Sequence, residues 1–205
     1  MSRIIEAKEI RSKKTVDLAR WLVGKQLVRR SGDWDPELRL RITETEAYDG
    51  ERDLACHASK GRTPRSEVLY LPGGVWYVYL CYGIHEMLNL VAGPADWPAA
   101  VLIRGVEGIS GPGRITRALN VDRGLNRAPA EPSTGLWLED DGFVASPARI
   151  TRTPRIGVDY AGPVWAAKPW RFVLTPYAES VNPIERAATR DRSKHSPAHR
   201  RHEGR

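Results

Sequence analysis

Two carboxylates lie in a strongly alternating stretch of the sequence, "ELRLRITETEAYDG" at residues 37–50. Its aliphatic and charged residues alternate, which predicts a strand with one apolar face. Continued at the same period, that face carries Glu44, Glu46 and Tyr48 toward the interior. Two interpretations stay open. Either the strand ends near Thr43 and both glutamates are solvated, or one carboxylate sits at a cavity edge, where it can act as a general base on water.

An arginine interrupts the apolar face of a second predicted strand, "AVLIRGVEG". Arg104 shares its parity with Ala100, Leu102 and Val106. A guanidinium cannot lose its charge, so an inward arginine needs a carboxylate or phosphate partner. An inward glutamate would satisfy it, either as a structural salt bridge or as part of a catalytic pair.

The cysteines and histidines have no metal-ligand spacing. Cys56 and Cys81 are the only cysteines, and neither forms a zinc motif with the nearby His57 or His85. We therefore expect no metal and no cofactor. A lone loop histidine is most often a surface residue, so His57 has no role on pattern alone. Two cysteines without a disulfide framework are typical of a reducing cytoplasm.

Tyrosines are concentrated in "GGVWYVYLCYG" at residues 73–83, which ends at a glycine. The following "MLNLVA" predicts a partner strand, so the two segments form a hairpin around Gly83. One interpretation is a hairpin buried on both faces. The other places Tyr82 exposed at the hairpin tip, with Tyr77 and Tyr79 on one shared face.

These segments belong to a chain in which short predicted strands outnumber helices. Residues 15–24 predict a helix, and Thr15 is a candidate N-cap. A second, short helix is predicted in "GPGRITRALNV". No βαβ alternation, internal repeat or domain boundary is visible. The pattern indicates one mixed, mainly β domain over residues 1–180.

The net charge of +7 is unevenly distributed. Residues 186–205 hold seven Arg/Lys and two Asp/Glu, so they supply +5 of it. Few apolar residues occur there, and we expect a disordered basic tail over 181–205. The tail is either a tether to a polyanion or a solubilising terminus. No window approaches the roughly 18 apolar residues of a membrane span, and no secretory signal is apparent. We expect a cytoplasmic protein, nucleoid-associated if bacterial, with no membrane partner.

The motifs together resemble the alkyladenine (3-methyladenine) DNA glycosylase family. The resemblance starts from "RITETEAYDG", His57 and "RTPR". It continues through "PGGVWYVYLCYGIHEMLNLV", "AAVLIR", "GPGRITRAL" and "RIGVDYAG…KPWRFVL". These segments cover roughly residues 14–175 in the order of the family.

The resemblance implies an α+β fold, a compact single domain with a curved, mainly antiparallel sheet, short helices and a protruding hairpin. It also implies a monofunctional hydrolase that removes alkylated or deaminated purines from double-stranded DNA without lyase activity. The damaged purine would be extruded from the duplex. We expect a monomer, because nothing in the pattern indicates an oligomer.

Residue roles follow from the same resemblance. Glu46 matches the general base, Arg104 the arginine that helps hold the attacking water, and Ile156 the residue whose carbonyl does the same. The base-contacting positions match Tyr48, His57, Tyr79, Asn89 and Leu102, with Asn89 as the gate against normal guanine. Tyr82 matches the side chain that fills the gap left in the duplex.

This chain departs from the family between Gly108 and Gly111, where relatives usually carry a longer, often basic segment. The departure leaves a second hypothesis open, a non-catalytic protein that binds lesions on the same scaffold. A third is a structural DNA- or RNA-binding protein that uses its tyrosines as stacking platforms.

Overall fold

The computed structural model describes residues 2–32 and 34–175. The predicted tail, 181–205, lies outside these residues, as do the last residues of the predicted domain, whose 1–180 boundary stays a prediction. No helix in the described residues is long and apolar enough to cross a membrane.

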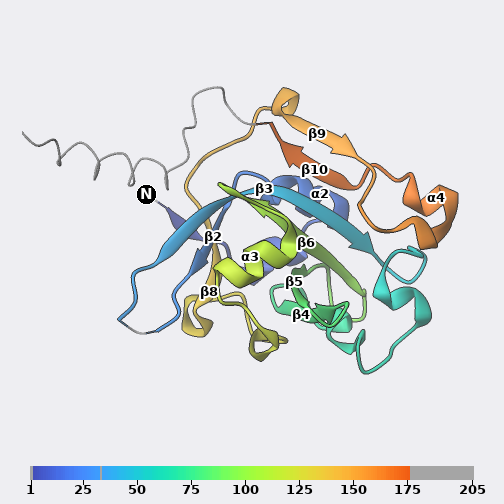
Figure 1. The fold of residues 1–205 in the computed structure, drawn as a ribbon, viewed down its shortest axis with the longest axis horizontal. Coiled ribbons are helices and arrows are strands. Elements are labelled where there is room, and N and C mark those ends of the chain that lie inside the picture. The colour runs from blue at the N-terminus through green and yellow to red at the C-terminus, as the bar shows by residue number, and fades with distance from the viewer. Residues whose placement is uncertain (1, 33, 176–205) are drawn as a thin grey trace, which may run out of the picture. The chain divides into compact units, whose positions relative to one another are not determined.

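Within these residues, ten strands form one antiparallel sheet with the order β1-β8-β2-β3-β6-β5-β4 (Figure 1). β10 pairs with β3 and β9, and β7 pairs with β6. The strands are β1 (Arg3–Ile4), β2 (Gln26–Arg29), β3 (Leu38–Asp49), β4 (Trp76–Cys81), β5 (His85–Val91), β6 (Ala99–Val106), β7 (Ile109–Ser110), β8 (Leu136–Asp140), β9 (Ile150–Thr153) and β10 (Arg171–Leu174). The helices are α1 (Ala7–Arg11), α2 (Thr15–Leu22), α3 (Pro112–Ala118) and α4 (Gly162–Ala166). The predicted α+β class, a curved antiparallel sheet with a few short helices, is confirmed.

β3 is the central strand of the sheet and pairs with three other strands. Its first half pairs with β2, its second half pairs with β10, and its other edge pairs with β6. In Figure 1 the long blue arrow of β3 crosses the molecule and ends near the loops that precede β4 and α4. The expected strand in "ELRLRITETEAYDG" therefore continues past Thr43, and the interpretation that it ends there is wrong.

An irregularity in β3 corrects the predicted direction of its glutamates. The register against β6 shifts between Ile42 and Thr45. Ile42 and Ala47 both belong to the main hydrophobic core, and the Thr45 hydroxyl donates to the Ala19 carbonyl of α2. Residues of odd number therefore face the core beyond the bulge. Glu44 and Glu46 point inward as predicted, but on the face opposite to Ile42.

Two hydrophobic clusters lie on the two faces of the sheet. The main core includes Trp76, Val101 and Ile103, and α2 packs against it. The second cluster contains Tyr77 and Ala100, with Tyr48 and Tyr79 packed on it. α2 was predicted correctly, but its N-cap is Lys14 and Thr15 is its first residue; the Thr15 hydroxyl donates to Asp49.

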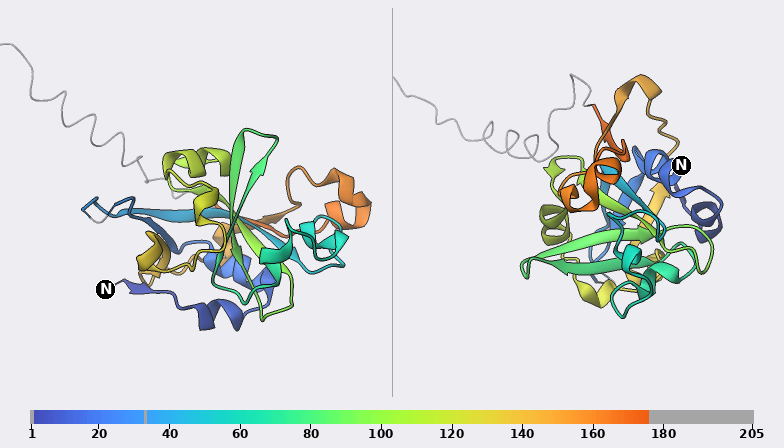
Figure 2. Two further views of the ribbon diagram at one scale, coloured as in Figure 1. Left: turned by 90° about the horizontal axis from the view of Figure 1, so that it is seen from below. Right: turned by 90° about the vertical axis from the view of Figure 1, so that its right-hand side faces the viewer.

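The β4–β5 hairpin is the expected strand pair around Gly83, and Figure 2 shows it rising from the sheet. Its base is buried on both faces, with Trp76 toward the main core and Tyr77 toward the second cluster. At the tip, Tyr82 and Gly83 have φ of +50° and +73°, and the Ile84 N–H donates to the Cys81 carbonyl. Two successive positive φ values are typical of the tight type I′ hairpin turn.

Gly135 offers a test of the β2–β8 pairing. Its φ is +74°, its carbonyl accepts from the Arg30 N–H, and a Cβ there would lie 2.4 Å from the Arg30 carbonyl oxygen. Gly135→Ala adds this backbone clash to the strain of about 1–2 kcal/mol that a left-handed non-glycine residue carries. We expect urea unfolding to give a loss of more than about 2 kcal/mol. Gly142→Ala is the control, since Gly142 has φ of +84° and open space around its Cβ; equal losses would contradict the clash.

Candidate functional site

A cavity of about 1090 Å³ opens between the β4–β5 hairpin, the face of β6, the loop after β3 and the segment before α4. This volume is at the upper end of the range for small-molecule pockets. Among the residues that line it are Tyr48, His57, Arg65, Tyr77, Tyr79, Tyr82, Asn89, Leu102, Arg104, Ile156 and Tyr160. Every predicted base-contacting residue thus borders one cavity.

The Glu46 carboxylate lies just behind this lining. Its side chain is fully buried. Oε1 accepts from the Ile156 N–H at 2.8 Å, and Oε2 accepts from the Tyr48 hydroxyl at 2.9 Å. Arg104 Nε lies 3.5 Å from Oε1. Tyr48, Arg104 and Ile156 all line the cavity, and Glu46 does not. The carboxylate is therefore separated from the cavity only by the residues that bind it.

Burial raises the pKa of Glu46 above its usual value. The charge of Arg104, the Ile156 N–H and the Tyr48 hydroxyl act in the opposite direction, while Glu44 adds to the increase. A carboxylate with a raised pKa is a stronger proton acceptor than an exposed one. The same environment raises the pKa of Tyr48 well above its usual value, through burial first and the Glu46 charge second.

Arg104 is divided between two carboxylates. Its Nε donates to Glu44 Oε1 at 2.8 Å, closer than the 3.5 Å to Glu46. Arg171 Nε on β10 donates to the same Glu44 oxygen at 2.6 Å. Glu44 thus collects two guanidinium groups beside Glu46. The predicted Arg–Glu pairing is present, but with Glu44 as the nearer partner.

His57 is fixed by an aromatic neighbour that sequence reasoning gave no role. The Tyr77 hydroxyl lies 2.8 Å from His57 Nδ1, and the His57 and Tyr79 rings meet edge-on with centroids 4.7 Å apart. Burial, with the charges of Arg65 and Lys60, lowers the pKa of His57 to about 4. His57 is therefore a neutral member of the cavity wall at neutral pH. The sequence offered one indication of this role: Tyr77 lies two residues before Tyr79 and so faces the same side of β4.

Asn89 and Leu102 face each other across the β5–β6 pair. The Asn89 Nδ2 donates to the carbonyls of Tyr77 and Met87, both at 3.2 Å, and the residue is 4% exposed. Both amide hydrogens are used by the backbone, so the side chain is held against the wall and presents its oxygen.

Tyr82 stands apart from the buried wall. It lines the mouth of the cavity from the hairpin tip and is 91% exposed. A non-glycine residue at positive φ is strained, and such strain is concentrated at functional sites. The predicted exposed tip is present, and the fully buried hairpin is wrong for this residue.

The comparisons with known proteins agree with this geometry. A family model described as methylpurine-DNA glycosylase matches residues 9–110 and 107–178. The chain belongs to this family. The two matched segments overlap at residues 107–110, which comprise the β6–β7 turn and β7.

Several relatives are named "Putative 3-methyladenine DNA glycosylase". One from Psychrobacter cryohalolentis is 46% identical over 186 residues, covering 76% of this chain and 85% of the relative. One from Methanocella arvoryzae is 44% identical over 178 residues, covering 77% and 86%. One from Myxococcus xanthus is 46% identical over 165 residues, covering 76% and 82%.

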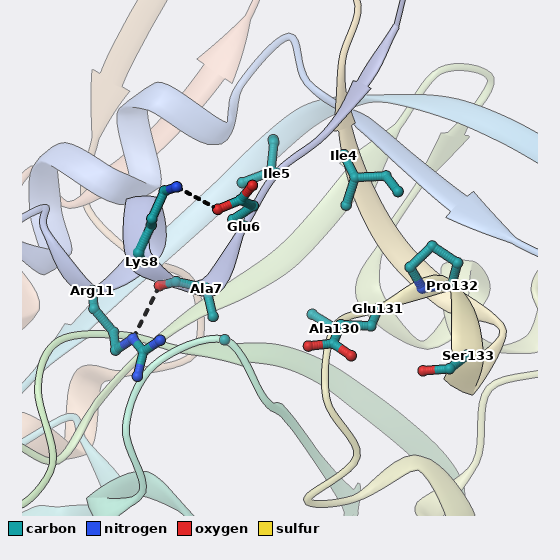
Figure 3. A pocket seen from close by; sticks show the side chains of 11 residues that line it. Ile4, Ile5, Glu6, Ala7, Lys8, Arg11, Ala130, Glu131, Pro132 and Ser133 are labelled. Carbon is teal, nitrogen blue, oxygen red and sulfur yellow. Dashed lines mark hydrogen bonds and ion pairs between the residues drawn. The ribbon is translucent and has the colours of Figure 1, made fainter.

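A second hollow of about 590 Å³ in this family member lies beside the N-terminal segment (Figure 3). Three of its charged side chains are engaged locally, with Lys8 paired to Glu6 at 2.7 Å and Arg11 Nε donating to the Ala7 carbonyl. No group of His, Cys, Asp and Glu side chains in the described part of the glycosylase chain has the arrangement of a metal site.

The burial of Glu46 makes stability depend on pH. Because its pKa is raised on folding, its ionised form costs stability above that pKa. We expect Glu46→Gln to unfold at higher urea concentration than wild type at pH 7.5. This advantage should fade as pH falls through the folded pKa of Glu46.

Glu139→Gln is the control for that titration. Burial acts to raise the pKa of Glu139, but hydrogen bonds from Arg39, Ser2 and Trp137 hold it below its usual value. That variant should therefore lose stability at neutral pH and recover relative to wild type in acid. A Glu46→Gln protein less stable than wild type at every pH would contradict the argument.

Proposed function

We propose that this protein is a monofunctional DNA glycosylase that hydrolyses the N-glycosidic bond of alkylated or deaminated purines extruded from duplex DNA. The substrates are of the 3-methyladenine, 7-methylguanine, hypoxanthine and ethenoadenine class. The observation that carries the proposal is the buried Glu46 carboxylate, placed behind an aromatic cavity large enough for a base.

The chemistry uses Glu46 as the general base. Its carboxylate takes a proton from water as the water oxygen forms a bond to C1′ of the damaged nucleotide. The C1′–N bond breaks, and its electron pair leaves with the purine. A purine alkylated at N3 or N7 departs as a neutral molecule and needs no acid. Hypoxanthine and ethenoadenine are neutral before cleavage and must take up a proton as they leave. Arg104 and the backbone of Ile156 border the position where this water would be held.

The cavity walls favour an electron-poor base. Tyr48, His57 and Tyr79 would sandwich it, and a cationic purine over tyrosine faces gains about 0.5–2 kcal/mol. Neutral His57 adds no opposing charge, because its pKa is about 4. The Asn89 side chain is prevented from moving aside by its two backbone hydrogen bonds and has Leu102 opposite. It would exclude normal guanine by steric overlap with the exocyclic amine, not by polarity.

Base release from duplex DNA tests the proposal. Wild type should release 7-methylguanine and 3-methyladenine in EDTA, and Glu46→Gln should bind the same duplex but release base at least about 100-fold more slowly. Glu107→Gln is a charge-matched control, because Glu107 is exposed on the β6–β7 turn. Lys60 lines the cavity, so borohydride trapping should accompany the assay; a trapped adduct would overturn the monofunctional assignment.

Failure of release has a defined meaning. If wild type and Glu46→Gln both bind these duplexes and a hypoxanthine-containing duplex, yet neither frees a base, the protein is a lesion binder on the glycosylase scaffold. If neither wild type nor Glu46→Gln binds lesion-containing duplex more tightly than undamaged duplex, both the glycosylase and the lesion binder are ruled out.

Tyr82 gives an independent test of base extrusion. As the wedge that replaces the extruded base, it should contribute about 1–3 kcal/mol of stacking, the usual worth of an aromatic against a base. Tyr82→Gly should bind lesion duplex about 5- to 150-fold more weakly in fluorescence anisotropy. Glycine suits the positive φ of this position, so the same variant should be at least as stable as wild type.

Trp34→Gly supplies the matched control, because Trp34 is an aromatic residue that is 99% exposed and does not line the cavity. Equal affinities for wild type and Tyr82→Gly would remove the wedge from the proposal.

A further inference from the structure

A fully buried ion pair lies directly behind the cavity wall and has no part in the chemistry above. Arg155 and Asp53 are 102 positions apart in the sequence, and both side chains are 0% exposed. Arg155 Nη1 donates to Asp53 Oδ2 at 2.5 Å, and Nη2 donates to Oδ1 at 2.8 Å. This is the bidentate geometry that a planar guanidinium makes with a carboxylate.

The guanidinium of Arg155 also contacts the backbone and side chains around Glu46. Nη1 donates to the Ala47 carbonyl at 2.8 Å, between Glu46 and Tyr48. Its plane lies against the Tyr48 ring at 4.8 Å from the centroid and against Trp170 at 5.1 Å. The Tyr48 ring is therefore packed against the Arg155 guanidinium.

Asp53 ties in the loop that follows β3. Its Oδ2 accepts from the Asp49 N–H and its Oδ1 from the Ala55 N–H, both at 3.1 Å. Figures 1 and 2 both show the end of β3 beside the segment that leads into α4. The ion pair fastens these two parts of the chain together.

Arg155 immediately precedes Ile156, whose N–H donates to Glu46. Arg155 is thus linked to two of the three residues that bind the carboxylate, to Tyr48 through the contact of its guanidinium with the ring and to Ile156 through the peptide bond. We propose that the Arg155–Asp53 pair is a positioning device that holds the Tyr48 hydroxyl and the Ile156 N–H on the Glu46 carboxylate.

Stability alone is a poor explanation for this pair. Removing two charges from water is costly, and well-packed apolar replacements of a buried ion pair are often neutral or stabilising. The Arg155 Nε has no hydrogen-bond partner among the described residues, which adds to that cost. An apolar pair could not supply the hydrogen bonds that these two side chains make to the backbone. Arg155 binds the carbonyl of Ala47, and Asp53 binds the N–H groups of Asp49 and Ala55.

Arg155→Lys is the first variant, because it keeps the charge but loses the planar fork and the stacking surface on Tyr48. With the Ile156 N–H no longer held, ionised Glu46 is less stabilised and its pKa should rise. The readout is the pH midpoint of the Glu46 carboxyl carbon by NMR in DNA-free protein, assigned with Glu46→Gln. The charged and titratable groups that face Glu46 are Arg104 from β6, Glu44 and Tyr48 from β3, and Arg155 itself. In Arg155→Lys all of these positions keep their charge.

Lys25→Met is the matched control. Lys25 Nζ pairs with Asp140 at 2.8 Å, with side-chain exposures of 7% and 15%, and neither residue lines the cavity. This variant should lose stability without moving the Glu46 midpoint. A double variant, Arg155→Gln with Asp53→Asn, removes both charges together and covers the case in which Arg155→Lys does not fold.

The consequence for base release rests on the proposed function. Misplacement of a reacting group by about 1 Å can cost about 100-fold in rate, so we expect Arg155→Lys to slow single-turnover release by about 30-fold. The acid limb of the pH–rate profile of this variant should move to higher pH, in parallel with the Glu46 midpoint. Lys25→Met should leave both unchanged.

The two readouts separate the possible failures. A shifted Glu46 midpoint in Arg155→Lys or the double variant, with no base release even by wild type, would sustain the positioning role while the proposed function fails. A midpoint equal to that of wild type in the folded variants would overturn the positioning role, whatever the release assay gives.

Discussion

The interaction on which the site depends is the burial of one carboxylate away from bulk water. An ionised group without solvent persists only when hydrogen bonds and opposite charges replace its hydration. Glu46 obtains them from the neighbouring residue on its own strand, from β6 and from the segment after β9. The sheet must therefore bring together residues 46, 104 and 156. The double pairing of β3, with β10 on one edge and β6 on the other, places β3 at the centre of this arrangement.

The sequence predicted the residue types and the cavity composition better than the directions of the side chains. Alternation in β3 indicated correctly that Glu46 turns inward, but it could not reveal the bulge between Ile42 and Thr45, which depends on the register against β6. The tip position of Tyr82 was predictable, because a glycine between two strands is a local turn signal. The Arg155–Asp53 pair was not, since its partners meet only when distant segments pack.

Several features of the site oppose stability, and they are the features that the proposed chemistry requires. Tyr82 holds a backbone conformation that glycine would adopt at lower cost, yet the proposed wedge requires a large side chain there. Burial raises the pKa of Glu46, which disfavours the ionised form that would accept a proton in the proposed reaction. Local rules of sequence are broken most clearly where the cavity meets solvent or buries charge, as expected of a functional site.

The sharing of Arg104 explains how a buried carboxylate can have a counter-charge and still keep a raised pKa, as the proposed role of a base requires. A close, bidentate guanidinium would stabilise ionised Glu46 strongly and lower its pKa. Glu44 instead takes Arg104 at 2.8 Å, leaving 3.5 Å to Glu46, and itself receives Arg171. The cationic charge remains near enough to keep Glu46 ionisable, while the balance of the pKa stays on the side of burial. Glu44 thus affects the Glu46 carboxylate both through its own charge and by engaging Arg104, and it does not line the cavity.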